Sequence, residues 1–255
     1  MGVAWRDTRG RRNALKNIKE IVQDVRALGI ESCITLGIID NQQARELKDA
    51  GLMAYNHNMD TSHEFYPSII STRTYDERLK TLSHVRDAGV NVCSGDILGL
   101  GKSEEDRIGR LHTVSTLPSH LESFPINALV PIKGTPLGDR PPVDFTSMLP
   151  TIATARLVMP ATIILIAAGR KTMSEEKQAL CFMAGANAMF TGEKMLTTEC
   201  NDWDEDAALF GRWGLEPMKS SEKNKRAWLM KCDLYSSHHQ SRVGTCSILQ
   251  RAMMI

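Results

Sequence analysis

The stretch TRTYDERLKTLSHVRDAGVNVCSGDILGLGKSEED, residues 72–106, decides the fold class because it contains a helix, a strand and the start of the next helix. Apolar side chains recur at helical spacing at Tyr75, Leu79, Leu82 and Val85. Gly89 ends this predicted helix, and an apolar strand broken at Gly95 follows over 90–98. Ser103 then begins another helix as a hydroxyl N-cap, with acidic residues in the first turn.

The same alternation extends in both directions along the chain. Further helices are predicted near 18–28, 41–50, 147–159 and 172–183, and further strands at 32–37, 53–58, 124–131, 162–167 and 186–190. Such alternation predicts parallel strands with right-handed crossovers, hence an α/β fold. We expect an incomplete (β/α)8 TIM-type barrel, although an open doubly wound sheet also fits the pattern. Residues 219–255 show no sustained period, so we expect an irregular, poorly ordered C-terminal tail after a domain over 1–218.

Composition excludes several classes of protein. The 255 residues carry a net charge of +1, which argues against a dedicated nucleic-acid or membrane-surface protein. The longest apolar run, Leu157 to Gly169, is broken by Pro160 and is shorter than the ~20 residues that span a bilayer. No secretory signal pattern is visible, so we expect a soluble protein.

Six cysteines are present, and no two form a CxxC pair. Cys33 and Cys93 fall on separate predicted strands, where inward-facing thiols can converge on an iron–sulfur cluster. Ordinary core filling explains the same positions equally well.

Polar side chains interrupt two other strands. Asn56, Asn58 and Asp60 alternate in YNHNMDT and would share one face at a strand end, where barrel chemistry takes place. An exposed strand end running into a loop is an equal alternative. Asn127 lies in the otherwise apolar PINALV, so its amide needs either a neighbouring strand or a ligand as partner.

Long segments of the chain resemble the biotin synthase family of the radical S-adenosylmethionine superfamily. They are YNHNMDTS, TRTYDERL, DAGVNVCSGDILGLG, TIATARLVMP, AAGR and CFMAGAN, and the likeness runs from Met1 to about Met218. TTECNDWDED and WGLEPM are similar to the fungal and plant branch.

The resemblance implies a barrel with a [4Fe–4S] cluster that reduces S-adenosylmethionine and a [2Fe–2S] cluster that donates sulfur to dethiobiotin. This reaction is the last step of biotin biosynthesis, a transferase reaction in which the cofactors carry the bond-making. By resemblance, the location would be mitochondrial in a eukaryote and otherwise cytoplasmic.

The resemblance also assigns residues. Cys33 and Cys93 match two of the three [2Fe–2S] cysteines, and no catalytic residue beyond such cluster ligands is identified. The residues matched to S-adenosylmethionine and substrate binding are Asn58, Asp60, Arg78, Ile97, Asn127 and Val130. Within that set, Asp60 suits ribose hydroxyls, Arg78 the methionyl carboxylate, and Ile97 and Val130 the adenine.

Several family features do not occur in this sequence. The CxxxCxxC loop that holds the [4Fe–4S] cluster, the first barrel strand and the third [2Fe–2S] cysteine would all precede Met1. Ile164 is placed where the family pattern I-R-L-A-A-G-R has its arginine ligand. Asp96 and Lys102 replace residues that are usually glycine and glutamate.

We therefore expect this chain alone to be inactive, because a cluster without its thiolates does not form. The alternative is a non-catalytic remnant that binds a nucleoside or dethiobiotin, or a degraded copy. Another barrel enzyme ranks last, since no Ser–His or Lys–carboxylate constellation is evident. The sequence leaves homodimerisation open and suggests neither a nucleic-acid nor a membrane partner.

Overall fold

The computed structural model describes residues 2–5, 12–192, 194–195 and 198–216. The strands are β1 (Gly2–Trp5), β2 (Cys33–Gly37), β3 (Ala54–Asn56), β4 (Asn91–Cys93), β5 (Asp96–Leu98), β6 (Ser123–Ala128), β7 (Ile163–Ile166), β8 (Ala188–Met189), β9 (Lys194–Met195) and β10 (Thr198–Glu199). The helices are α1 (Arg12–Ala27), α2 (Asn41–Asp49), α3 (Tyr66–Ile69), α4 (Tyr75–Asp87), α5 (Glu104–Ser115), α6 (Phe145–Val158), the 3-10 turn η1 (Arg170–Thr172), α7 (Glu175–Met183) and α8 (Trp203–Trp213). The predicted tail over 219–255 lies outside the described residues.

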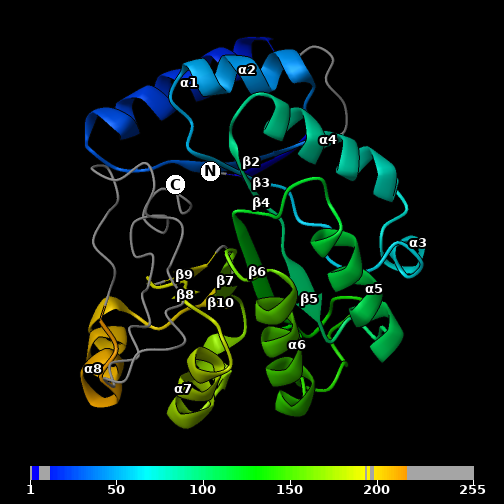
Figure 1. The fold of residues 1–255 in the computed structure, drawn as a ribbon, viewed down its shortest axis with the longest axis vertical. Coiled ribbons are helices and arrows are strands. Elements are labelled where there is room, and N and C mark those ends of the chain that lie inside the picture. The colour runs from blue at the N-terminus through cyan, green and yellow to red at the C-terminus, as the bar shows by residue number, and fades with distance from the viewer. Residues whose placement is uncertain (1, 6–11, 193, 196–197, 217–255) are drawn as a thin grey trace.

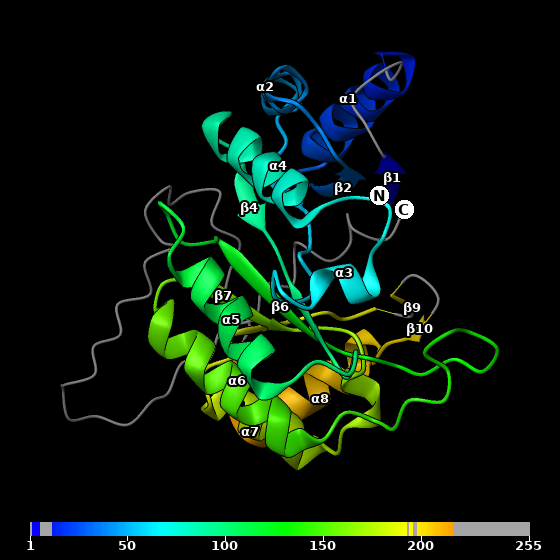
Figure 2. The ribbon, with the colours of Figure 1, turned by 90° about the vertical axis from the view of Figure 1, so that its right-hand side faces the viewer.

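One parallel sheet organises these elements. Its strands follow chain order, β1-β2-β3-β4-β6-β7-β8, and β5 pairs beside β6. The helices form an arc outside the sheet (Figures 1 and 2). A doubly wound sheet reverses its strand order and carries helices on both faces. Sequential order with helices outside is the barrel arrangement, so the doubly wound alternative is wrong.

Strand register separates the side chains into two faces. Ile34 pairs with Tyr55, and Phe124 pairs with Ile164, and all four belong to the large core beneath the helices. The intervening residues face the inside of the sheet, because successive side chains of a strand alternate between faces. A small apolar cluster lies there: Ile163, Leu165, Ala167, Ala188 and Phe190.

The helix boundaries follow local signals. Thr74 caps α4 and Ser103 caps α5, each through a capping box with the side chain three residues on. Gly89, after α4, has φ 72°, a conformation that glycine adopts without strain. The helix end predicted at Gly89 and the helix start predicted at Ser103 are thus confirmed.

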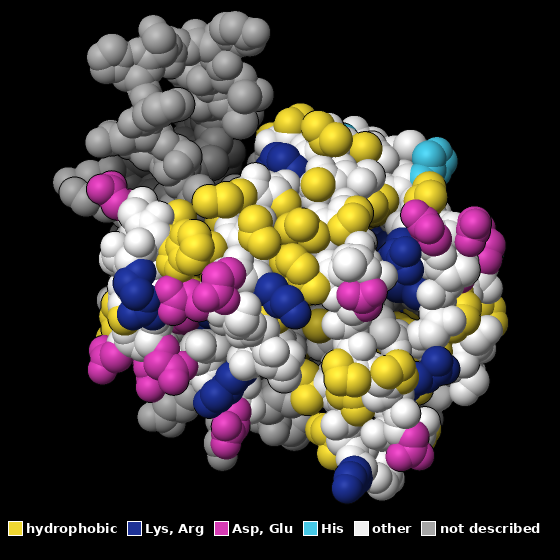
Figure 3. Space-filling model, turned by 90° about the horizontal axis from the view of Figure 1, so that it is seen from below, with side chains coloured by type: hydrophobic (Ala, Val, Ile, Leu, Met, Phe, Trp, Pro, Cys, Tyr) yellow, Lys and Arg dark blue, Asp and Glu magenta, His cyan; other side chains and the backbone are white. Residues whose placement is uncertain are grey.

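The surface seen from below carries acidic and basic side chains interspersed with hydrophobic ones (Figure 3). Among the described residues, no helix is both long enough and apolar enough to cross a bilayer.

Candidate functional site

The chain after β3 turns sharply at Asp60. The strand ends at Asn56, so the prediction that Asn56, Asn58 and Asp60 alternate along one continuous strand is wrong. Asp60 has φ 67° and is the single non-glycine residue with positive φ in the part of the chain that is described. Aspartate tolerates this left-handed conformation better than most residues do, but it still needs support from its surroundings.

Backbone contacts with the β4–β5 segment provide that support. The Asp60 amide donates to the carbonyl of Gly95 at 3.2 Å, and the Ile97 amide donates to the carbonyl of Asp60 at 3.1 Å. Oδ1 of Asn58 accepts a hydrogen bond from the Gly95 amide at 2.8 Å. The turn is therefore fixed against the strand that carries Ile97.

Arg78 on α4 joins Asn58 and Asp60. Its Nη1 lies 3.0 Å from Oδ2 of Asp60 and also donates to the carbonyl of Asn58. Its guanidinium lies over the ring of Tyr66 at 5.3 Å. Burial raises the pKa of Asp60, and the nearby positive charge of Arg78 opposes that shift.

Some polar atoms around this turn are buried and have no hydrogen-bond partner among the described atoms. They include Nε of Arg78, the hydroxyl of Tyr66 and Oγ1 of Thr61. Buried polar atoms are normally paired, so orphaned atoms are expected where a ligand or water belongs. This region therefore fits a polar ligand.

Asn127 lies on β6 and links β5 to the segment just after β7. Its Nδ2 donates to the carbonyl of Asp96 at 3.0 Å, and its Oδ1 accepts from the Ala168 amide at 3.2 Å. Ile97 is its register partner, so the two side chains share the inner face. A primary amide can make four hydrogen bonds, which leaves one N–H and one lone pair of Asn127 for a ligand. Val130, just beyond β6, is half-buried.

Cys33 and Cys93 both belong to the inner face. Cys33 pairs with Ala54 and Cys93 pairs with Asn56, so the thiols lie two residue positions apart along the same face. Burial raises the pKa of the Cys93 thiol to about 12, which favours the protonated form in this environment.

These thiols meet the geometric requirement for an iron–sulfur cluster only in part. Cys33 and Cys93 share a face, but within the described ranges no three His, Cys, Asp or Glu side chains gather as a metal site. Among the described residues, Cys33 and Cys93 are therefore two candidate ligands without a third beside them.

The inner face also corrects the placement of the missing arginine. Ile164 lies on the helix-facing side, in the large core with Phe124. Counting back from Gly169-Arg170, the arginine of I-R-L-A-A-G-R falls on Leu165. Leu165 lies on the inner face, in register with Ala188, whereas a side chain at Ile164 could not reach a cluster there.

A buried charge cluster behind the turn was not identified as functional from the sequence. Nζ of Lys102 contacts Oδ1 of Asp96, and both side chains are 2% exposed. Fully buried Arg110 donates through Nη2 to Oγ and the carbonyl of Ser94 and to the carbonyl of Gly95. The signal in the sequence was the appearance of two opposite charges, Asp96 and Lys102, within one glycine-bearing turn.

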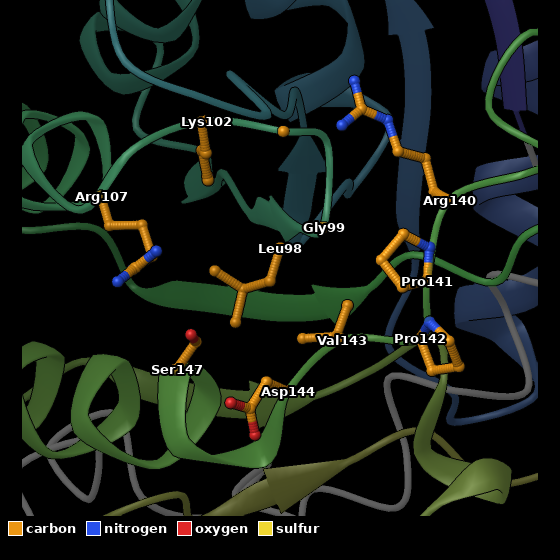
Figure 4. A pocket seen from close by; sticks show the side chains of 11 residues that line it. Leu98, Gly99, Lys102, Arg107, Arg140, Pro141, Pro142, Val143, Asp144 and Ser147 are labelled. Carbon is orange, nitrogen blue, oxygen red and sulfur yellow. The ribbon is translucent and has the colours of Figure 1, made fainter.

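A cavity of about 260 Å³ opens beside this turn (Figure 4). Its walls come from the end of β5, the β5–α5 turn, the start of α5, the segment that precedes α6 and the first turn of α6. The lining residues are Leu98, Gly99, Gly101, Lys102, Arg107, Arg140, Pro141, Pro142, Val143, Asp144 and Ser147. A Cβ on Gly99 would come within 2.7 Å of Cγ2 of Val143, so the two segments pack closely. Lys102 therefore lies between this cavity and the buried carboxylate of Asp96.

Comparison with known proteins identifies the family. Residues 8–114 match the Radical SAM superfamily, and residues 125–216 match the Biotin and Thiamin Synthesis associated domain. The mitochondrial biotin synthase of Emericella nidulans is 66% identical over 94% of this chain and 61% of the relative. That of Arabidopsis thaliana is 56% identical over 93% of this chain and 63% of the relative. The biotin synthase of Rhizorhabdus wittichii is 50% identical over 88% of this chain and 67% of the relative.

This chain belongs to the biotin synthase family. The predicted resemblance is thus confirmed, and the most similar of these three relatives is fungal. The chain spans 61% and 63% of the length of the first two relatives.

A solved structure supports the fold of this family member. The crystal structure of methylornithine synthase superposes with a TM-score of 0.67 at 21% identity, covering 82% of this chain and 65% of the other. That likeness bears on the fold alone and agrees with an incomplete parallel α/β barrel.

Proposed function

We propose that this chain forms the substrate-binding part of a biotin synthase, in which S-adenosylmethionine and dethiobiotin bind across the turn at Asp60 and the inner face of the sheet. Membership of the family supports this proposal. The observation that carries it is the convergence of Asn58, Asp60 and Arg78 beside the register pair Ile97 and Asn127.

Each side chain has a separate role in this proposal. The Asp60 carboxylate accepts hydrogen bonds from ribose hydroxyls, and Arg78 pairs with the methionyl carboxylate. Asn58 and Asn127 orient the two ligands through their remaining hydrogen-bonding capacity. Ile97 and Val130 contact the adenine, so that the charged end and the base of the ligand are held by different elements.

Cys33 and Cys93 are proposed as thiolate ligands of a [2Fe–2S] cluster. In the family, bound S-adenosylmethionine and iron–sulfur clusters supply the radical chemistry and the sulfur. The part played by this chain is to present two thiols on a buried face, where water is excluded. Metal coordination stabilises the deprotonated thiolate and so overcomes the raised pKa of Cys93.

A mitochondrial location is proposed because the relatives from Emericella nidulans and Arabidopsis thaliana are named mitochondrial.

Ligand binding by the purified chain tests the proposal. Titration calorimetry should detect S-adenosylmethionine, and Asp60→Asn should weaken that binding at least tenfold, about 1.4 kcal/mol. Asp49→Asn is the matched control, because Asp49 is exposed at the end of α2, away from the turn. No binding by the unmodified chain, or equal affinity in Asp60→Asn, would contradict the proposed function.

Anaerobic reconstitution tests the cluster ligands separately. Iron and sulfide bound by the chain should fall when Cys33→Ser and Cys93→Ser are combined. Cys181→Ser serves as the control, since Cys181 is buried in the large core. Equal iron in all three proteins would exclude Cys33 and Cys93 as ligands.

A further inference from the structure

The ion pair of Lys102 and Asp96 lies in the interior next to the ligand-binding turn. Each side chain is 2% exposed, and Nζ of Lys102 contacts Oδ1 of Asp96. Removing two charges from water is costly and is tolerated only where the partners are closely held. The two side chains of this buried pair are therefore held in defined positions, unlike those of a surface ion pair.

On one side the pair holds Asp60. Asp96 stands between Gly95 and Ile97, the two residues whose backbones bind the backbone of Asp60. Nζ of Lys102 also lies 3.5 Å from the carbonyl oxygen of Asp60, at the long end of hydrogen bonding. The left-handed conformation of Asp60 is thus supported by the strand residue and by the lysine that pairs with it.

On the other side the pair holds Asn127. The carbonyl of Asp96 accepts the hydrogen bond from Nδ2 of Asn127 at 3.0 Å. A displacement of Asp96 would therefore move the amide of Asn127 as well as the backbone around Asp60. Asp96 is coupled in this way to two of the side chains proposed to contact the ligands, Asp60 and Asn127.

We propose that Lys102 and Asp96 are positioning residues, which together fix the orientation of the Asp60 carboxylate and the Asn127 amide toward their ligands. This inference deepens the proposed function and rests on it for the identity of the ligands. Neither residue needs to touch a ligand itself.

Three variants separate positioning from bulk stability. Lys102→Met removes the donor to Asp60 and leaves Asp96 as an unpaired buried charge. The double variant Asp96→Asn, Lys102→Met removes both charges, so it should recover much of the thermal stability that the single variant loses. Affinity for S-adenosylmethionine should remain at least tenfold reduced in both. A double variant that binds within twofold of the unmodified chain would overturn the proposal.

Asp206→Asn provides a matched control. Asp206 forms a similarly buried pair with Arg170 of η1, at 2.6 Å and with side chains 2% and 3% exposed, and Arg170 also donates to the carbonyl of Phe190, just after β8. This variant should lose thermal stability comparable to that lost by Lys102→Met, while its affinity stays within twofold. An equal loss of affinity in Asp206→Asn would show that any buried ion pair has the same effect, and would refute the inference.

Hydrogen exchange tests the inference without a ligand. In Lys102→Met the amides of Asp60 and Ile97 should exchange at least tenfold faster, relative to the amide of Asn187, which donates to the carbonyl of Ile164 near β7 and β8. Unchanged relative protection would refute positioning. If the unmodified chain binds no S-adenosylmethionine but this local change is seen, the proposed function fails and the positioning role stands.

Discussion

Replacement of Asn127 by leucine should destabilise the protein by about 1–3 kcal/mol. The side chain makes two hydrogen bonds, to the Asp96 carbonyl and from the Ala168 amide. Each such bond contributes about 0.5–1.5 kcal/mol, and leucine, which is close in size, leaves both backbone groups without their partner. Because Asp96 lies on β5 and Ala168 just after β7, the loss should reduce the free energy of unfolding of the whole sheet.

Urea unfolding followed by far-UV circular dichroism measures this difference, with an unchanged m-value showing that the same surface is exposed. Asn91→Leu is the matched control, since Asn91 is also half-buried on the inner face and its side chain has no hydrogen bond given by the structure. The control should stay within about 0.5 kcal/mol. If Asn127→Leu unfolds at the same urea concentration as the unmodified chain, the reasoning that the Asn127 amide stabilises the sheet is refuted.

Three further predictions concern burial and backbone conformation. Burial, assisted by neighbouring arginines, lowers the pKa of His57 to about 3. Below pH 6.5, the ordinary pKa of histidine, His57 therefore binds a proton in the unfolded chain but not in the folded one. Stability should therefore fall by about 1.4 kcal/mol per pH unit below 6.5, and His57→Gln should lack this slope in urea titrations between pH 6.5 and 5. In the same assay, the free energy of unfolding of Asp206→Asn should fall by about 3–5 kcal/mol, and a fall below about 1 kcal/mol would mean that the Arg170 guanidinium finds another acceptor. The free energy of unfolding of Gly169→Ala should fall by about 2–5 kcal/mol, because φ is 82° and a Cβ would lie 2.6 Å from the Ala128 side chain. Gly29→Ala, which has positive φ but open space around it, should lose only about 1–2 kcal/mol, and equal losses would show that backbone strain alone acts.

Helix and strand periodicity predicted most of the parallel sheet. The segment over 72–106 gave α4, β4, β5 and the start of α5, because its caps and apolar spacing agree with its final environment. The helix α8, 11 residues long and capped by Asp202, was not predicted, although both its length and its cap are visible in the sequence. The short strand β1, the single turn of α3 and the β9–β10 hairpin were not predicted either. Elements this short carry too few residues for a period to be recognised, and tertiary contacts decide them.

The candidate site shows where alternation helps and where it fails. Cys33, Cys93 and Asn127 sit in regular strands, so their common inner face follows from sequence spacing. Asp60 lies beyond the end of β3, where a left-handed residue breaks the alternation and backbone contacts with Gly95 set its direction. Such a contact between distant segments leaves no trace in local periodicity.

The position that matches the family arginine shows how much a shift of one residue along a strand changes. Ile164 and Leu165 are neighbours of similar size, yet one belongs to the helix-facing core and the other to the inner face. A shift of one residue in a strand reverses the face of every side chain. A motif therefore assigns this position correctly only if the residues along the strand are counted correctly. Both the count back from Arg170 and the inner-face position in the strand agree with Leu165.

The electrostatics of the turn favour an anionic ligand group. Lys102 and Arg110 contribute positive charge on the core side, and Arg78 does so on the ligand side, against the carboxylates of Asp60 and Asp96. Three cations against two carboxylates leave an excess positive charge of one in a region where water is scarce, and burial there raises the pKa of Asp60 and lowers the pKa of Lys102. A ligand carboxylate that approaches Arg78 would neutralise the excess. The same imbalance supports the proposed role of Asp96, because without its carboxylate Lys102 and Arg110 would face each other uncompensated behind the residues proposed to contact the ligand.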